Sequence, residues 1–92
     1  MIQFLVHDKK DTIGVATMDV KSGETVQGLY MDTREPIQIK ALKEIPLGHK
    51  IAVRNMKVND TVIKYGHDIG RVVADIEAGD HVHIHNLKTK RW

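Results

Sequence analysis

Three histidines near the C-terminal end of the chain alternate with other residues at strict two-residue spacing. Residues 81–86 read HVHIHN, so half of the six histidines in the chain lie in this segment. Successive side chains of a β-strand point to opposite faces, so a strand here would carry all three imidazoles on one face. Because imidazole binds divalent metal ions and titrates near neutral pH, the pattern predicts a face that binds a metal ion or transfers protons.

Strand geometry limits how many of these imidazoles can share one ion. Alternate residues of a strand lie about 6.5–7 Å apart at the α-carbon, so the outer histidines of the three diverge. We therefore predict two ligands from this strand together with a residue from another chain. His83 and His85 are the preferred pair, and His81, at the junction between turn and strand, is the further metal-ligand candidate, with a solvated turn residue as the alternative.

Two other segments carry titratable groups. His49 and Lys50 follow directly after Gly48, which suits the binding of an anionic substrate; the alternative is an exposed loop pair. His67 precedes Asp68 in a glycine-flanked segment, where a tight turn could bring the two side chains together. We predict a substrate-facing His67, against the alternative of a structural histidine bonded to backbone. Solvated side chains are the simpler interpretation for His7, Arg54 and Lys64.

An apolar period of two runs along the whole chain and would position these groups on strands. No segment has an apolar stripe of helical length, although a short helical turn is allowed around residues 40–44. The sequence therefore predicts one mainly β (all-β) domain over residues 1–92, built as a compact barrel of short strands. The expected strands are residues 2–7, 12–18, 25–31, 37–42, 50–54, 61–65, 71–74 and 81–86.

One octet recurs four times between these strands. Its form is polar, apolar, two variable residues, glycine, two polar residues and apolar, and the copies span 19–26, 44–51, 55–62 and 75–82. Asn59 replaces the glycine in the third copy. Glycine and asparagine best tolerate positive φ, so each copy predicts a tight turn between a buried apolar anchor and a strand. The irregular spacing favours a pseudo-symmetric barrel over a solenoid.

Composition narrows the functional classes. A chain of 92 residues buries only about 60% of its unfolded surface, so we expect a modest core and a site completed by another chain. A net charge of +2 and only 4% aromatic residues argue against nucleic acid as a partner. No apolar run approaches the roughly 20 residues of a membrane span. With no cysteine and no leader-like start, a cytoplasmic, unprocessed protein is expected.

The basic C-terminal end and the missing motifs refine this expectation. Lys88, Lys90 and Arg91 would form either an anion-facing edge or a solvated tail. The sequence has no nucleophilic serine or cysteine arrangement and no glycine-rich nucleotide loop. Covalent hydrolysis and NAD chemistry are therefore unsupported.

Four motifs, in order along the chain, resemble a known family. They read GHKIA from Gly48, IKYGHDIG from Ile63, DIEAG from Asp75 and HVHIHN from His81. Together they resemble the SAF-type β-clip domain of altronate and galactarate dehydratases, and the resemblance runs from Ile2 to the C-terminus. In altronate dehydratases this domain begins a much longer chain, whereas the ending at residues 87–92 resembles the free-standing small subunits of sulfolactate sulfo-lyases.

The resemblance implies a β-clip, SAF-like barrel and a lyase subunit that works with a large catalytic subunit. The implied reaction is β-elimination from a small anionic 2-hydroxy acid, releasing sulfite from sulfolactate or water from altronate or galactarate. The implied cofactor is iron(II), with manganese as a second divalent ion. Such an elimination needs a base, a positive centre and help for the leaving group, and His67 and His83 are the predicted catalytic residues.

Two other classes of function stay open at this point. The same domain could be a non-catalytic module that binds a sugar acid or a partner surface. It could also be a small metal carrier that uses the histidine strand, and self-association is compatible with each alternative.

Overall fold

The chain is built from short strands, as its period of two predicts. A computed structural model describes residues 1–64, 67–83 and 87–88, with the backbone alone described for residues 64, 67, 68, 87 and 88. These residues form nine strands and no helix, which confirms the all-β prediction. The strands are β1 (Phe4–Val6), β2 (Ile13–Ala16), β3 (Thr25–Tyr30), β4 (Pro36–Lys40), β5 (Lys50–Ala52), β6 (Thr61–Lys64), β7 (His67–Val72), β8 (His81–Val82) and β9 (Leu87–Lys88).

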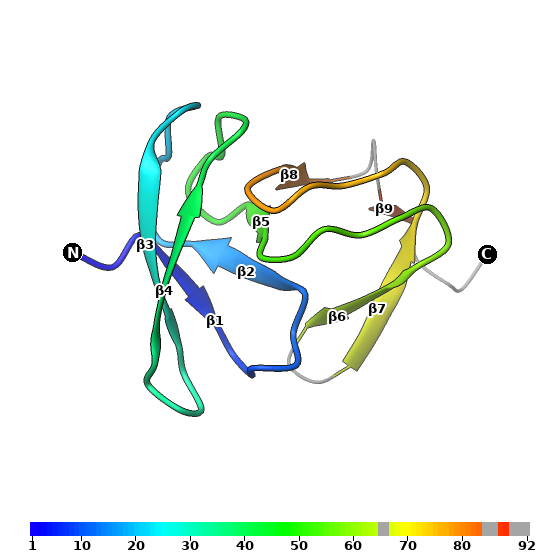
Figure 1. The fold of residues 1–92 in the computed structure, drawn as a ribbon, viewed down its shortest axis with the longest axis horizontal. Helices are drawn as coiled ribbons and strands as arrows, with labels where there is room; N and C mark the ends of the chain where they lie inside the picture. The colour runs from blue at the N-terminus through cyan, green and yellow to red at the C-terminus, as the bar shows by residue number, and fades with distance from the viewer. Residues whose placement is uncertain (65–66, 84–86, 89–92) are drawn as a thin grey trace.

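The described strands form two sheets (Figure 1). The larger sheet has the order β4-β3-β1-β2-β5-β8 and the smaller one the order β6-β7-β9. Among the described pairs β1 and β3 are parallel, and all others are antiparallel. Thr12 joins the sheets, because its amide donates to the Ile63 carbonyl at 2.9 Å and its hydroxyl accepts from the Ile63 amide at 3.0 Å.

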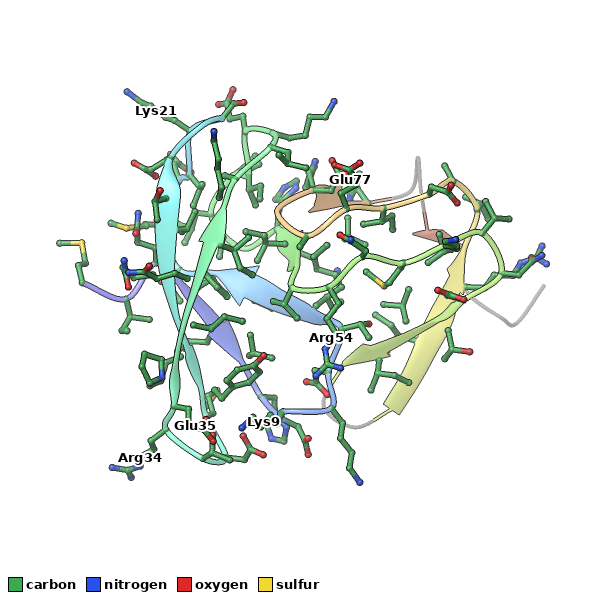
Figure 2. The ribbon with its side chains drawn as sticks, viewed as in Figure 1. Lys9, Lys21, Arg34, Glu35, Arg54 and Glu77 are labelled. Carbon is green, nitrogen blue, oxygen red and sulfur yellow. The ribbon has the colours of Figure 1, made fainter. Side chains whose placement is uncertain are left out.

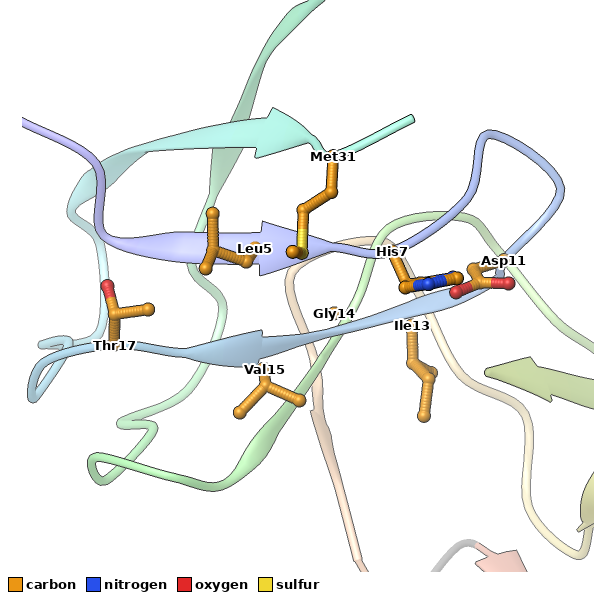
Figure 3. Close-up of a pocket in the computed structure, with 8 residues that line it drawn as sticks. All are labelled: Leu5, His7, Asp11, Ile13, Gly14, Val15, Thr17 and Met31. Atoms are coloured by element: carbon orange, nitrogen blue, oxygen red, sulfur yellow. The ribbon is translucent and has the colours of Figure 1, made fainter. Parts of the chain in front are cut away.

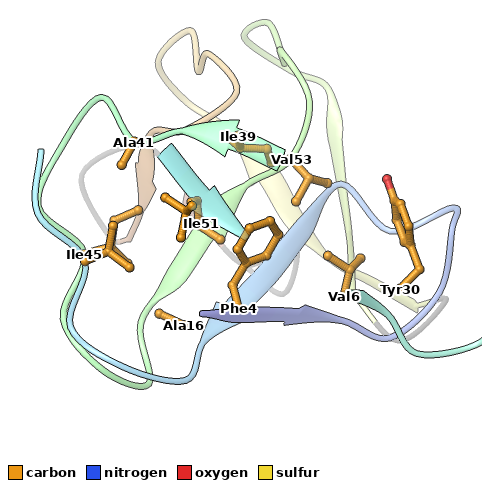
Figure 4. Packing of buried hydrophobic residues seen from close by; sticks show 11 residues of the cluster. Phe4, Val6, Ala16, Tyr30, Ile39, Ala41, Ile45, Ile51 and Val53 are labelled. Atoms are coloured by element: carbon orange, nitrogen blue, oxygen red, sulfur yellow. The ribbon is translucent and has the colours of Figure 1, made fainter. Parts of the chain in front are cut away.

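Buried apolar side chains of the described residues gather in two clusters. Phe4 and Val6, both 0% exposed, lie in the first cluster, whereas Leu5 between them faces the other side of the sheet. Gly28 is required there, because a Cβ at that position would overlap the Phe4 ring. Burial of a side chain such as Phe4 or Val6 contributes about 1.5–3 kcal/mol to the free energy of unfolding. The first cluster, shown in Figure 4, includes Phe4, Val6, Ala16, Tyr30, Ile39, Ala41, Ile45, Ile51 and Val53. The second contains Ile13, Ala52, Met56, Val62, Val72, Ile76 and Val82.

All four octets form the predicted turns. The fifth residue has a φ of +87° at Gly23, +84° at Gly48, +75° at Asn59 and +95° at Gly79. In each turn the amide of the sixth residue donates to the carbonyl of the third, as in a type II β-turn. The prediction that Asn59 substitutes for glycine is therefore confirmed.

The octets pair with each other through their apolar anchors. Val20 and Ile45 form one isolated antiparallel bridge, and Met56 and Ile76 form the other. All four side chains are buried, as predicted. In three octets, the side-chain oxygen of the polar first residue accepts a hydrogen bond from the backbone amide of the fourth residue of the partner octet. Asp19 accepts from Leu47 at 2.8 Å, Asp75 from Val58 at 3.0 Å and Asn55 from Ala78 at 2.8 Å.

The predicted helical turn at residues 40–44 is absent. Lys40 ends β4, and the chain then bends. The Ala41 amide donates to the Glu24 carbonyl at 2.8 Å, and the Leu42 amide donates to the Gly79 carbonyl at 3.0 Å. The Ala41 carbonyl accepts from the Gly23 amide at 2.7 Å, and the Ile45 amide donates to the Val20 carbonyl at 2.9 Å, so the helical bond between residues 45 and 41 is replaced by bonds to a distant segment.

One strand prediction and one loop prediction change near the C-terminal end. Of the predicted histidine strand, His81 and Val82 form β8, His83 lies in a bend, and residues 84–86 lie outside the described residues. The glycine-flanked loop predicted around His67 is wrong over residues 67–70, where the backbone belongs to β7. His67 pairs with Lys64, and Asp68 pairs with Ile63, so both are held in a hairpin with β6.

Charged contacts fix the loop between β1 and β2 (Figure 2). The Lys9 ammonium donates to Glu35 at 2.7 Å, and the Arg54 guanidinium donates to the Lys9 carbonyl at 2.7 Å. The hydrogen bond between Lys9 and Glu35 raises the pKa of Lys9 and lowers the pKa of Glu35. In the described ranges, no helix is long and apolar enough to cross a bilayer.

Candidate functional site

Three histidines from two distant segments meet at the edge of the larger sheet. His49 immediately precedes β5, His81 begins β8, and His83 follows β8. One ring nitrogen of each lies within 4.8 Å of the others. The His81 and His83 rings are stacked at 5.5 Å and 8°, and the His49 and His83 rings at 5.4 Å and 30°. We refer to these residues as the histidine cluster.

The strand register explains why the cluster forms. β5 and β8 are antiparallel, with Lys50 opposite Val82 and Ile51 opposite His81. Opposite residues of a pair share a face, and so do residues two apart along one strand. Continuing the register by one residue sets His49 across from His83. The three imidazoles therefore share the face of Ile51.

Octet turns hold the backbone on both sides of the cluster. The His49 amide donates to the Pro46 carbonyl within its own turn, and the His49 carbonyl accepts from the Ala16 amide, each at 2.9 Å. On the other side, the Gly79 amide donates to the Ala52 carbonyl at 2.8 Å. Two rigid turns thus aim His49 and His81 at each other.

The contact between His49 and His81 defines what the cluster can do with a proton. His49 Nδ1 and His81 Nε2 are 2.8 Å apart, which is a hydrogen-bond distance. One of these nitrogens must carry the proton and the other must accept it, so the pair cannot be fully protonated in this geometry. His49 and His81 are half-buried, whereas His83 is exposed. The cluster therefore combines a hydrogen-bonded imidazole pair with one imidazole that is exposed to solvent.

The same donor set fits a divalent transition metal ion. Imidazole nitrogen is a preferred ligand of zinc, iron, copper and nickel. Metal–nitrogen bonds of about 2.0–2.1 Å place two tetrahedral ligands roughly 3.4 Å apart. The cluster nitrogens lie within 4.8 Å of one another, so side-chain movements of about 1 Å would bring them to this spacing.

The cluster combines two sets of residues that the sequence kept separate. His81 and His83 were predicted as metal ligands, whereas His49 was predicted to bind substrate. The octet could have indicated that His49 and His81 are related, because each follows the glycine of an octet turn within two residues. His85 lies outside the described residues, so its predicted role stays a prediction.

The other predicted site residues do not join this group in the described structure. Lys50 alternates with His49 along the chain and pairs with Val15 of β2, so it faces the opposite side of the sheet. His49 and Lys50 therefore face different sides of the sheet, and their predicted roles in substrate binding stay predictions. For His67 only the backbone is described, at the start of β7, and its predicted catalytic role stays a prediction.

A pocket of about 230 Å³ lies elsewhere, along β1 and β2 (Figure 3). Its walls are largely apolar, and at one end the His7 ring lies beside the carboxyl group of Asp11, which is 0% exposed. Because the lining is mainly apolar, a small polar anion would lose its hydration there with few hydrogen-bond partners in return. The pocket is therefore a poor match for a small hydroxy acid. It is lined by Leu5, His7, Asp11, Ile13, Gly14, Val15, Thr17 and Met31.

Comparisons with known proteins find relatives along the whole chain. The altronate/galactarate dehydratase SAF domain family matches residues 2–90. The (2R)-sulfolactate sulfo-lyase subunit alpha of Chromohalobacter salexigens is 48% identical over 92 residues, which cover 99% of this chain and 98% of that one. The subunit of the same name from Paracoccus pantotrophus is 56% identical over 55 residues, or 60% of this chain and 82% of that one. Altronate dehydratase of Bacillus subtilis is 36% identical over 89 residues, which cover 97% of this chain but 17% of the dehydratase.

Proposed function

Because this chain belongs to the altronate/galactarate dehydratase SAF domain family, we propose that it is the small subunit of a two-chain lyase. The substrate is (2R)-sulfolactate, and the products are pyruvate and sulfite. The observation that carries this proposal is the 48% identity to a sulfo-lyase alpha subunit, over 98% of that subunit. A cytoplasmic location is part of the same proposal.

A second candidate is the corresponding part of a hydro-lyase that acts on altronate or galactarate. The 36% identity to altronate dehydratase favours it, since that match covers 97% of this chain. In either case a large catalytic chain is the proposed partner. The dehydratase supports this partner, because 89 matched residues make up only 17% of its length.

The proposed reaction needs one proton removed and one leaving group released. The proton on C2 of sulfolactate goes to a base, the C2–C3 double bond forms, and the C3–S bond breaks, so that sulfite leaves with the bonding pair. The resulting enol takes a proton at C3 and loses the proton of its hydroxyl group, which gives pyruvate. The enzyme must therefore supply a base, a positive centre for the developing enediolate, and a proton.

The histidine cluster contributes part of this machinery. His83 is the exposed member of the cluster, and it and His67 are the two proposed catalytic residues. His49 and His81 are hydrogen-bonded to each other at 2.8 Å and place two further imidazoles beside His83. A divalent ion, iron(II) or manganese, would stabilise the enediolate as a Lewis acid. A substrate role for Lys50 would require contact on the other face of β5.

Co-expression tests the proposed function directly. The neighbouring reading frames are first searched for a long lyase-like chain. This chain is then produced together with the 92-residue chain, and sulfite release is measured with (2R)-sulfolactate and divalent iron. We expect sulfite only when both chains are present. Full activity of the 92-residue chain alone would contradict the subunit role. Dehydration of altronate or galactarate without sulfite release would select the hydro-lyase instead.

Replacement of His83 tests whether the chain takes part in catalysis or is a non-catalytic binding module. His83→Ala should lower the turnover of the assembled enzyme by about 100-fold or more, the range expected when a catalytic imidazole is lost. His7→Ala is the matched control, because His7 lines the separate pocket. Unchanged turnover with His83→Ala would favour a non-catalytic module.

A further inference from the structure

We propose that His49, His81 and His83 together bind one divalent transition-metal ion, which bridges β5 and the edge strand β8. This ligand set replaces the predicted His85 by His49. The metal site deepens the proposed function, and it rests on that function only for the reaction in which the ion takes part.

Sheet geometry favours a ligand from the neighbouring strand over a further ligand from the same segment. Directly opposite residues of an antiparallel pair lie about 4.5–5.5 Å apart, whereas alternate residues of one strand lie about 6.5–7 Å apart. His49 lies across from His83 when the β5–β8 register is extended by one residue. Among the described residues, the neighbour of His83 at the shorter spacing is therefore His49.

The hydrogen bond in the cluster already aligns two of the three donors. His49 Nδ1 and His81 Nε2 point at each other across 2.8 Å. When each ring carries its hydrogen on its other nitrogen, the two facing nitrogens each offer a lone pair, and a small turn of each ring directs both at one ion. The His83 nitrogen lies within 4.8 Å of both and completes a three-nitrogen set.

The surroundings of the cluster leave the ion accessible and positively charged. The half-buried His49 and His81 would form the inner side of the site, and the exposed His83 its rim. The Asp80 carboxylate is engaged by its own turn, where it accepts from the Glu77 amide at 3.3 Å. Three neutral imidazoles leave the ion its full charge and a free coordination position, as in catalytic metal sites.

The ligands come from parts of the chain that meet only in the folded state. His49 and His81 are 32 residues apart. Strand β8 contains only His81 and Val82, at the end of the larger sheet. The ion would therefore tie this short edge strand to β5, and its binding would stabilise the fold by mass action.

Cobalt(II) titration of the chain, produced without a histidine tag, tests the site. Visible absorption and calorimetry should show one cobalt ion per chain. His49→Ala should weaken binding by about 100-fold, since loss of supporting groups alone costs 10–100-fold. His7→Ala and His85→Ala should leave the affinity within a factor of about 3. Circular dichroism of each metal-free variant checks the fold, and His49→Gln replaces His49→Ala if the alanine variant does not fold.

Each outcome supports or overturns the inference. One cobalt per chain, lost with His49→Ala and kept with His85→Ala, supports it. Absence of stoichiometric binding overturns it, as does strong weakening by His85→Ala with none by His49→Ala. Cobalt binding through the cluster, without lyase activity in the presence of the large chain, would contradict the proposed function and leave the metal site standing. Sulfite release by an enzyme whose small subunit binds no cobalt would do the reverse.

Discussion

The turn at Gly79 links the fold to the histidine cluster, and Gly79→Ala should damage both. Gly79 has a φ of +95°, and its carbonyl accepts from the Leu42 amide at 3.0 Å while its amide donates to the Ala52 carbonyl at 2.8 Å. A Cβ at this position would overlap the Lys40 carbonyl oxygen. The turn would have to move, and His81 would move with it.

Gly23 provides a matched control for this substitution. Its φ is +87°, but a Cβ there would have nothing within 4 Å. Alanine at either position lowers the free energy of unfolding by about 1–2 kcal/mol, because the backbone there is left-handed. Gly79→Ala also strains or breaks two hydrogen bonds, each worth about 0.5–1.5 kcal/mol. We therefore expect a loss of roughly 2–5 kcal/mol for Gly79→Ala, against about 1–2 kcal/mol for Gly23→Ala.

Urea unfolding of the two variants measures the difference. With a denaturant slope of about 1–2 kcal/mol per molar, the midpoint of Gly79→Ala should lie roughly 1–2 M below that of Gly23→Ala. Cobalt binding should also weaken in Gly79→Ala and persist in Gly23→Ala. Equal midpoints for the two variants would refute the close approach between the fourth octet turn and the end of β4.

Three further predictions concern the octets and the charged loop. Asn59→Gly should leave the free energy of unfolding nearly unchanged, whereas Asn59→Ala should lower it by about 1 kcal/mol because of its φ of +75°, as measured by urea unfolding. Asp19→Ala should cost about 1 kcal/mol, because the Leu47 amide loses its acceptor at 2.8 Å, and hydrogen exchange at that amide should accelerate. The pKa of Glu35 is lowered by the hydrogen bond from Lys9, so its stabilising effect is present above the ordinary value of 4.5 and is lost as pH falls through the folded value. NMR titration should find this lowered pKa in the wild type and the ordinary value in Lys9→Met, with little change in stability at neutral pH, since both side chains are exposed.

Local patterns along the sequence predicted most of the fold. Alternation located seven strands near their observed positions because inward and outward residues differ so clearly, as with buried Phe4 and Val6 around Leu5. The octets predicted the four turns because positive φ restricts the residue type strongly. The helical turn at residues 40–44 failed because Ala41 and Leu42 bond to Glu24 and Gly79, which no local window contains.

The histidine cluster could not be predicted in full from the spacing of residues along one strand. His81 and His83 could be paired from their alternation, but His49 joins them only through the β5–β8 register. Strand register depends on turns and buried faces over the whole domain. The same register separates His49 from Lys50, which are neighbours in the sequence but face opposite sides of the sheet.

The place of β8 in the sheet also sets an order of events during synthesis. β8 pairs with β5, whose residues 50–52 leave the ribosome about thirty residues earlier. Pairings between distant segments form slowly, because a long loop must close before any contact is gained. His49 is therefore made before His81 and His83, and the β5–β8 pairing that unites them forms only after all three are present. A nascent or truncated chain that ends before β8 contains only His49 of the histidine cluster. The proposed ion can therefore bind only after β8 has joined the sheet.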